Sequence, residues 1–159
     1  MKEEPPEPRP RVIVDARTLT AVDDVSGDTA RWVALAEHVL VDEGHGARPV
    51  ELTVHMVDED AIADLNREHM GGNGPTDVLA FPLDDPGEVP ANMTVLLGDV
   101  VLCPAVAAAQ ASEGDGLVGE LSLLLVHGIL HLLGHDHLEP EERVLMQKRE
   151  GELLDGFGR

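Results

Sequence analysis

The chain of 159 residues is poor in cysteine, in basic residues and in long apolar runs. Its one cysteine, Cys103, cannot form a disulfide within the chain, which fits a reducing, cytoplasmic environment. No run of about eighteen apolar residues, the length that would suggest a membrane span, is present. The longest candidate, 121–134, is shorter and contains two histidines, so we expect a buried helix and no membrane association.

Lysine and arginine number 11 against 31 aspartate and glutamate residues, and the formal net charge is −20 at pH 7. Proteins that bind nucleic acid usually present a basic face to the phosphate backbone. The composition therefore argues against tight, nonspecific binding of polyanions. Any RNA-binding face has to be local and built from a few arginines, while the acidic surface as a whole favours solubility.

The first ten residues, MKEEPPEPRP, contain four prolines and three glutamates, and no apolar segment follows them. We expect residues 1–10 to form a disordered lead-in rather than a secretion signal. The rest of the chain, 11–159, has the length of one domain with a single core. No internal repeat and no second domain are indicated, so a single compact domain is predicted.

Hydrophobic periodicity predicts an α/β (α+β) fold with a mixed sheet of about four strands. Strands are expected over 11–15, 50–56, 76–82 and 93–103, the last being either a strand pair or one strand with a bulge at Gly98-Asp99. Helices are expected over 32–40 with a stop at Gly44, from Asp58 to about 71–75, from Pro104, over 117–133, and from Pro140 toward Leu154.

The most unusual stretch is VHGILHLLGHDH, Val126 to His137, where four of the eight histidines fall within eleven residues. On a helix, His127 and His131 lie one turn apart on the same side. Gly134 can end that helix in a left-handed conformation and let His137 turn back toward them. Imidazoles buried among leucines cost free energy unless each is hydrogen-bonded or bound to a metal. The pattern H-x3-H-x5-H therefore predicts a metal site formed by the three histidines.

Nitrogen ligands favour Zn²⁺, with Ni²⁺ and Co²⁺ also compatible, so one zinc ion per chain is expected at the end of the apolar helix. Three protein ligands are typical of catalytic zinc sites, which keep a position for water, whereas structural sites have four. Cys103 and His135 are the possible fourth ligands. Cys103 is better explained as a small buried residue, and His135 could instead contact substrate or solvent. An open site that activates water is the favoured interpretation.

The spacing also matches the H-E-x-x-H-x-x-G-x-x-H motif of zinc proteases, but Gly128 stands where the glutamate belongs. The general base of those proteases is therefore absent. Asp136 is the nearest carboxylate in the sequence. It could act as a base, or it could accept a hydrogen bond that fixes the tautomer of an imidazole, and we favour the second role. It could also simply end the turn.

Three blocks, HGILHLLGHDH (127–137), GPTDVLAFP (74–82) and LGDVVLCP (97–104), resemble the signature of the YbeY family of bacterial endoribonucleases. The resemblance extends over about 12–154. It implies a metal-hydrolase domain of α/β fold, with zinc held by the three histidines at the end of a cleft. It also implies cleavage of single-stranded RNA in small-subunit rRNA 3′-end maturation and ribosome quality control, with the ribosome or ribosomal proteins as partners.

Two positions depart from the family pattern. Many members have tyrosine at the position of His135. The family often has an arginine, thought important for activity, where this chain has Met70. Arg67, one helical turn earlier, could supply a cation, although it is explained more simply as a solvated helix residue. Thr76 and Asp77 could line the substrate groove, or Thr76 could merely begin a strand.

Three hypotheses remain. The first is a zinc endoribonuclease. The second is a non-catalytic ribosome-assembly factor in which the metal braces the fold, as Met70 and the net charge suggest. The third is a zinc hydrolase of another substrate, such as a peptide or small amide, which Gly128 argues against.

Overall fold

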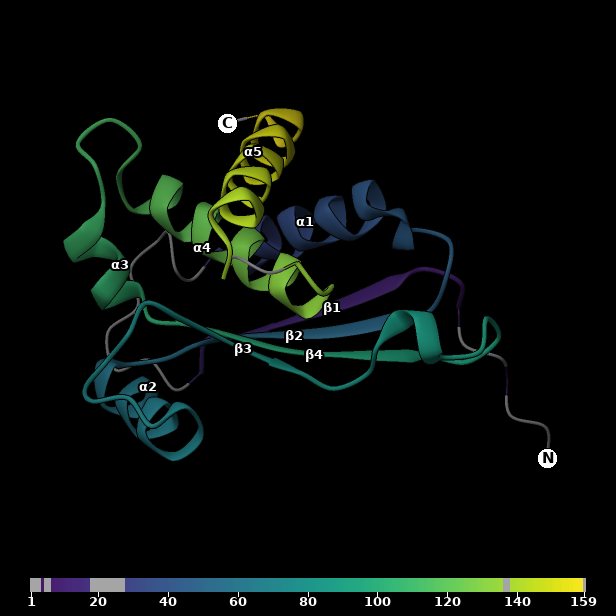
Figure 1. Ribbon diagram of the computed structural model, residues 1–159, viewed down its shortest axis with the longest axis horizontal. Coiled ribbons are helices and arrows are strands. Elements are labelled where there is room, and N and C mark those ends of the chain that lie inside the picture. The colour runs from purple at the N-terminus through teal and green to yellow at the C-terminus, as the bar shows by residue number, and fades with distance from the viewer. Residues whose placement is uncertain (1–3, 5–6, 18–27, 136–137, 159) are drawn as a thin grey trace.

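The computed structural model describes residues 4, 7–17, 28–135 and 138–158 and is built on one four-stranded sheet (Figure 1). The strands are β1 (Pro10–Asp15), β2 (Val50–Met56), β3 (Val78–Pro82) and β4 (Val95–Leu102), in the order β1-β2-β4-β3. β2 pairs in parallel with both β1 and β4, while β3 runs antiparallel to β4. The predicted mixed α/β sheet of about four strands is confirmed.

Of the two structures predicted for 93–103, the single bulged strand is the one observed. The register of β2 with β4 pairs Glu51 with Leu96 but Leu52 with Gly98, so Leu97 is the extra residue. Gly98 has φ 138°, and a Cβ there would overlap the carbonyl oxygen of Phe81 on β3. Only glycine therefore allows β3 and β4 to approach at the irregularity.

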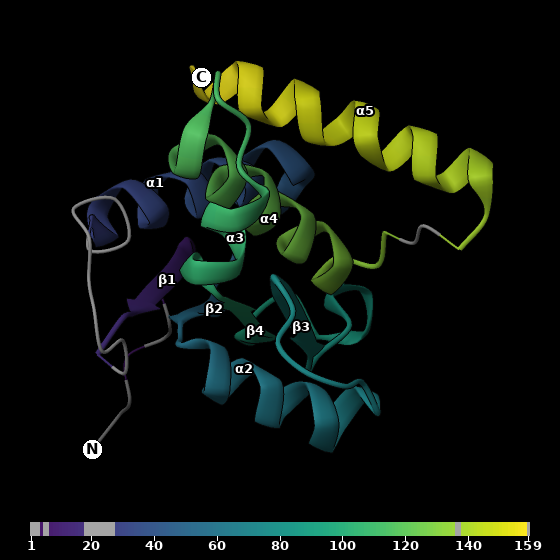
Figure 2. The same cartoon turned by 90° about the vertical axis from the view of Figure 1, so that its left-hand side faces the viewer.

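Helices cover the two faces of the sheet unequally (Figures 1 and 2). One face carries α1 (Thr29–Leu40), α3 (Pro104–Gln110), α4 (Gly116–Leu132) and α5 (Pro140–Phe157), and the other carries α2 (Glu59–Leu65). The main core lies between the sheet and the group formed by α1, α4 and α5. A smaller cluster under α2 contains Cys103, which is buried as a free thiol, as predicted.

Two helices end in a π-helical turn that the sequence patterns did not predict. α1 continues into η1 (Val41–His45), where Gly44 is non-helical with φ 91° and so confirms the predicted stop, and α2 continues into η2 (Asn66–Met70). A short 3₁₀ turn, η3 (Pro86–Glu88), lies within the acidic segment between β3 and β4. Because η2 delivers Met70 to the edge of β3, this turn helps to shape the candidate site described below.

The predicted boundary between the N-terminal lead-in, residues 1–10, and the domain, residues 11–159, is tested only in part. Pro10 was expected in the lead-in, but parallel pairing with Val50 extends β1 to that residue. Residues 1–3 and 5–6 lie outside the described part of the chain, so the predicted disorder stays a prediction.

Among the described helices, none combines the length and the apolar character that crossing a membrane requires.

Candidate active site

The C-terminal end of α4 carries the first two predicted metal ligands. His127 and His131 lie side by side, with ring centroids 4.8 Å apart and ring planes at 78°. α4 then ends in a Schellman motif, in which the N–H of Gly134 (φ 97°) bonds to the carbonyl of His131 and that of His135 to the carbonyl of Leu130. The predicted adjacency of the two histidines and the turn at Gly134 are both confirmed.

A cavity of about 430 Å³ lies beside the two imidazoles. β3 supplies one side, α4 another, and the end of η2 a third; the lining residues are Met70, Asp77, Val78, Leu79, Ala80, Pro82, His127, Gly128 and His131. Its surface is therefore largely apolar apart from the two histidines and Asp77. Among the described residues that line this cavity, none is lysine or arginine.

Gly128 brings α4 close to the sheet. A Cβ at this position would lie 2.8 Å from Cγ1 of Val100 and 3.4 Å from Cγ2 of Val78. At the position that carries the catalytic glutamate in zinc proteases, a side chain would therefore force Val100 or the helix to shift. The protease-type base is absent from the sequence, and the packing at Gly128 disfavours a side chain at that position.

Glu150 of α5 is a carboxylate that the sequence analysis missed. It is 6% exposed, and its Oε1 lies 2.8 Å from Nδ1 of His127. The sequence did hold a signal, because Glu150 shares the buried face of α5 with Met146, Leu153 and Leu154. An acidic residue at an apolar helical position needs a hydrogen-bond donor nearby.

His135 is directed to a different carboxylate. Its Nε2 lies 2.9 Å from Oε1 of Glu43 in η1, and the other oxygen of Glu43 accepts a 3.1 Å hydrogen bond from Nε of Arg149. His135 does not line the 430 Å³ cavity. Its predicted roles, as a fourth ligand or a substrate contact, stay predictions, and Glu43 is a second residue that sequence reasoning missed.

Asp77 lines the cavity, whereas Thr76 does not. The Oδ1 of Asp77 accepts a hydrogen bond from the N–H of Val78 at 2.8 Å, which fixes the carboxylate at the start of β3. Glu120 lies on α4 two turns before His127, on the same face of the helix. Burial raises the pKa of Glu120, and the negative charge of Asp77 raises that pKa further. Asp77 is the carboxylate among the described residues that line the cavity, and Glu120 is not part of that lining.

Met70 and Arg67 occupy different surroundings. Met70 is 52% exposed and lines the cavity. The side chain of Arg67 is 65% exposed, bonds to Oδ1 of Asp64 at 3.0 Å, and is absent from the lining. The simpler prediction for Arg67, a solvated helix residue, agrees with this geometry, and its possible substrate role is not tested.

The predicted third ligand, His137, and Asp136 lie outside the described residues. Within the part that is described, no three His, Cys, Asp or Glu side chains gather as metal ligands. The two histidines nevertheless suit a zinc ion. A zinc-bound imidazole has its ring centre about 3 Å from the ion, since Zn–N bonds measure about 2.0–2.1 Å. Two ring centres 4.8 Å apart can therefore share one ion.

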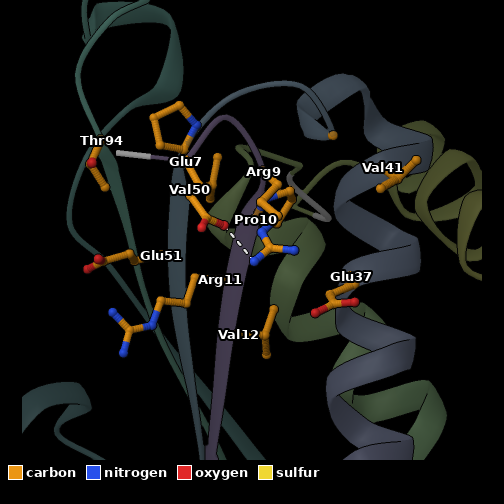
Figure 3. A pocket seen from close by; sticks show the side chains of 12 residues that line it. Glu7, Arg9, Pro10, Arg11, Val12, Glu37, Val41, Val50, Glu51 and Thr94 are labelled. Atoms are coloured by element: carbon orange, nitrogen blue, oxygen red, sulfur yellow. Dashed lines mark ion pairs between the residues drawn. The ribbon is translucent and has the colours of Figure 1, made fainter. Parts of the chain in front are cut away.

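A larger cavity, about 750 Å³, lies at the N-terminal ends of β1 and β2, next to α1 (Figure 3). Its charged side chains are of both signs, and Arg9 pairs with Glu7 there. None of the residues predicted to carry chemistry lines it. The smaller cavity beside the histidines is thus the better candidate for an active site.

The chain is similar to known proteins over most of its length. A family model described as Endoribonuclease YbeY matches residues 19–158. A protein named Endoribonuclease YbeY from Salinispora tropica is 51% identical over 136 residues, covering 80% of this chain and 86% of the relative. One of the same name from Thermobifida fusca is 45% identical, covering 85% and 89%. The solution structure of TM1509 from Thermotoga maritima matches with TM-score 0.59 and 25% identity, covering 92% and 91%.

Proposed function

The chain belongs to the YbeY family of endoribonucleases, and on this premise we propose that it is a zinc-dependent hydrolase of single-stranded RNA. The observation that carries the proposal is the pair of imidazoles, His127 and His131, in the wall of a cavity bounded by α4 and β3. His137 completes the proposed ligand set. The proposed biological role is small-subunit rRNA 3′-end maturation and ribosome quality control in the cytoplasm, with the ribosome or ribosomal proteins as partners.

In the proposed mechanism the three histidines hold the ion. When bound, zinc would polarise a phosphoryl oxygen and make a nucleophilic water available near neutral pH. Oε1 of Glu150 lies 2.8 Å from Nδ1 of His127, and a hydrogen bond donated by that nitrogen would leave the lone pair of the ring on Nε2. Asp136 is proposed to orient a second imidazole, or to serve as the base.

The lining of the cavity indicates how RNA would be held. Met70, Val78, Ala80 and Pro82 offer apolar surface, which can contact the face of an unpaired base or a ribose. Asp77 repels phosphate, so we propose that the phosphate backbone enters beside the histidines and away from the start of β3. Thr76, Arg67 and His135 lie outside the cavity lining, and their proposed contacts are with RNA beyond the cleaved bond.

The direct test is cleavage of a labelled single-stranded RNA by purified protein. His127→Ala and His131→Ala are each expected to reduce the cleavage rate by at least about 100-fold, since each removes a proposed ligand. His45→Ala is the matched control, because His45 is outside the cavity lining, and it should cleave at the wild-type rate. Unchanged cleavage in both ligand variants would refute the proposal, as would cleavage that survives exhaustive chelation.

The second candidate is a non-catalytic ribosome-assembly factor with a metal that braces the fold. It is favoured by Met70 and by the lack of a lysine or arginine among the described residues that line the cavity. In this case a ligand variant that still folds would restore ribosome maturation in cells that lack the wild-type protein. Hydrolysis of a peptide is a weaker candidate, because Gly128 stands where zinc proteases carry the general base.

A further inference from the structure

Glu150 is a buried acid on an otherwise apolar helix face. Its neighbours on that face of α5, Met146, Leu153 and Leu154, belong to the main core. Its side chain is 8% exposed, whereas Arg149 and Glu152 on the same helix are 26% and 49% exposed. An ionised carboxylate is unfavourable in such surroundings unless a donor or a positive charge compensates it.

The compensating group is the imidazole of His127. Oε1 of Glu150 lies 2.8 Å from Nδ1 of His127, across the contact between α5 and α4. The nearest arginine in sequence, Arg149, instead binds Glu43, Glu152 and the carbonyl of Asp42. The carboxylate of Glu150 is therefore committed to the histidine rather than to its neighbouring cation.

An ionised carboxylate can only accept hydrogen bonds, so a neutral imidazole that faces it must carry its proton on Nδ1. The lone pair then resides on Nε2. We infer that Glu150 is a positioning residue that holds His127 in the Nε2-ligating tautomer and orientation and raises the affinity of the site for a divalent cation. This inference rests on the proposed zinc function.

The competing explanation is that Glu150 only braces α5 against α4. The two explanations differ in what they require of the ring. A brace contributes to folding stability and places no demand on metal affinity, whereas a positioning residue controls the tautomer of His127 and the strength with which the site binds an ion. Both quantities can be measured without an RNA substrate.

The first measurement uses the wild-type protein without metal. Imidazole ¹⁵N and ¹H correlations recorded at about pH 8, above the ordinary histidine pKa, report which nitrogen of His127 is protonated. The expected result is protonation on Nδ1. Protonation on Nε2 would overturn the inference, and this arm requires no variant to fold.

The second measurement is zinc affinity, determined by competition with a chromophoric chelator. Glu150→Gln keeps the size of the side chain but removes its charge, and it is expected to weaken zinc binding by about 10- to 100-fold. Glu150→Asp keeps the charge with a shorter reach and is expected to fall between Glu150→Gln and wild type. Glu152→Gln is the matched control, with the same change on the exposed face of α5, and should bind zinc as wild type does.

The outcomes separate the inference from the function on which it depends. Equal zinc affinity in wild type and Glu150→Gln, with only a lower melting temperature in the variant, would show that Glu150 is a brace. A wild-type protein that binds no zinc would overturn the proposed function and this inference together. Should Glu150→Gln fail to fold, Glu150→Asp and the wild-type tautomer decide the question.

Discussion

The packing of α4 on the sheet at Gly128 can be tested by adding a single methyl group. In Gly128→Ala the new Cβ would lie 2.8 Å from Cγ1 of Val100, so the helix or the sheet must shift. Gly151→Ala is the matched change, because Gly151 is also inside a helix and nothing lies within 4 Å of the Cβ it would gain. Both variants share the gain in helix propensity, about 0.8–1.0 kcal/mol.

The difference between the two variants isolates the steric term. Overpacking of a well-packed interior costs about 1–3 kcal/mol, so Gly151→Ala should be more stable than Gly128→Ala by roughly that amount. For a chain of this length the melting temperatures should differ by roughly 2–12 °C. Urea denaturation and thermal unfolding would measure both variants after chelation, so that bound metal does not contribute to stability.

Equal stabilisation by the two substitutions would refute the reasoning. It would mean that α4 does not approach Val100 and Val78 as described, and that the position of Gly128 has room for a side chain. The steric argument against a protease-type base would then fail as well.

Three further predictions concern Met70, Cys103 and Glu120. Met70→Arg adds a cation to the cavity wall and should tighten RNA binding. The slope of log affinity against log salt concentration, measured by fluorescence anisotropy, should become steeper by about 0.7. A slope equal to that of Met70→Leu would contradict this prediction. Burial raises the pKa of the Cys103 thiol, so a thiol reagent should react with it only after denaturation; rapid reaction of the native protein would contradict its burial. Burial and the charge of Asp77 raise the pKa of Glu120, so its contribution to stability falls as pH rises from the ordinary pKa of a glutamate through the raised one. Glu120→Gln should flatten the dependence of folding stability on pH over that range. Asp77→Asn should lower the pKa of Glu120 in an NMR titration. A pKa of Glu120 that does not move in Asp77→Asn would contradict the coupling between the two carboxylates.

Elements with strong local patterns were predicted well. The alternation of apolar and polar residues over Val50–Met56 predicted the bounds of β2 correctly, because successive side chains of a strand point to opposite faces of the sheet. The helix with His127 and His131 was predicted to within a residue at each end, since Gly134 provides a local signal for its termination.

Features that depend on distant contacts were not predictable in the same way. The choice between a strand pair and a bulged strand at Gly98 depends on how closely the backbone of Phe81 approaches. Glu150 and His127 are 23 residues apart in sequence, and Glu43 reaches Arg149 over 106 residues. Local periodicity carries no information about such pairings, although an acid in the buried register of α5 could have drawn attention to Glu150.

The contact between α4 and α5 also has a consequence for the order in which the protein matures. Ribosomes synthesise α4 before α5, so a growing chain contains His127 and His131 before Glu150 exists to accept a hydrogen bond from the first ring. Until the last helix docks, that imidazole is free to exchange between its two neutral forms. A fragment that stops short of α5 would keep the two histidines of α4 and lack the acceptor that sets the state of one of them.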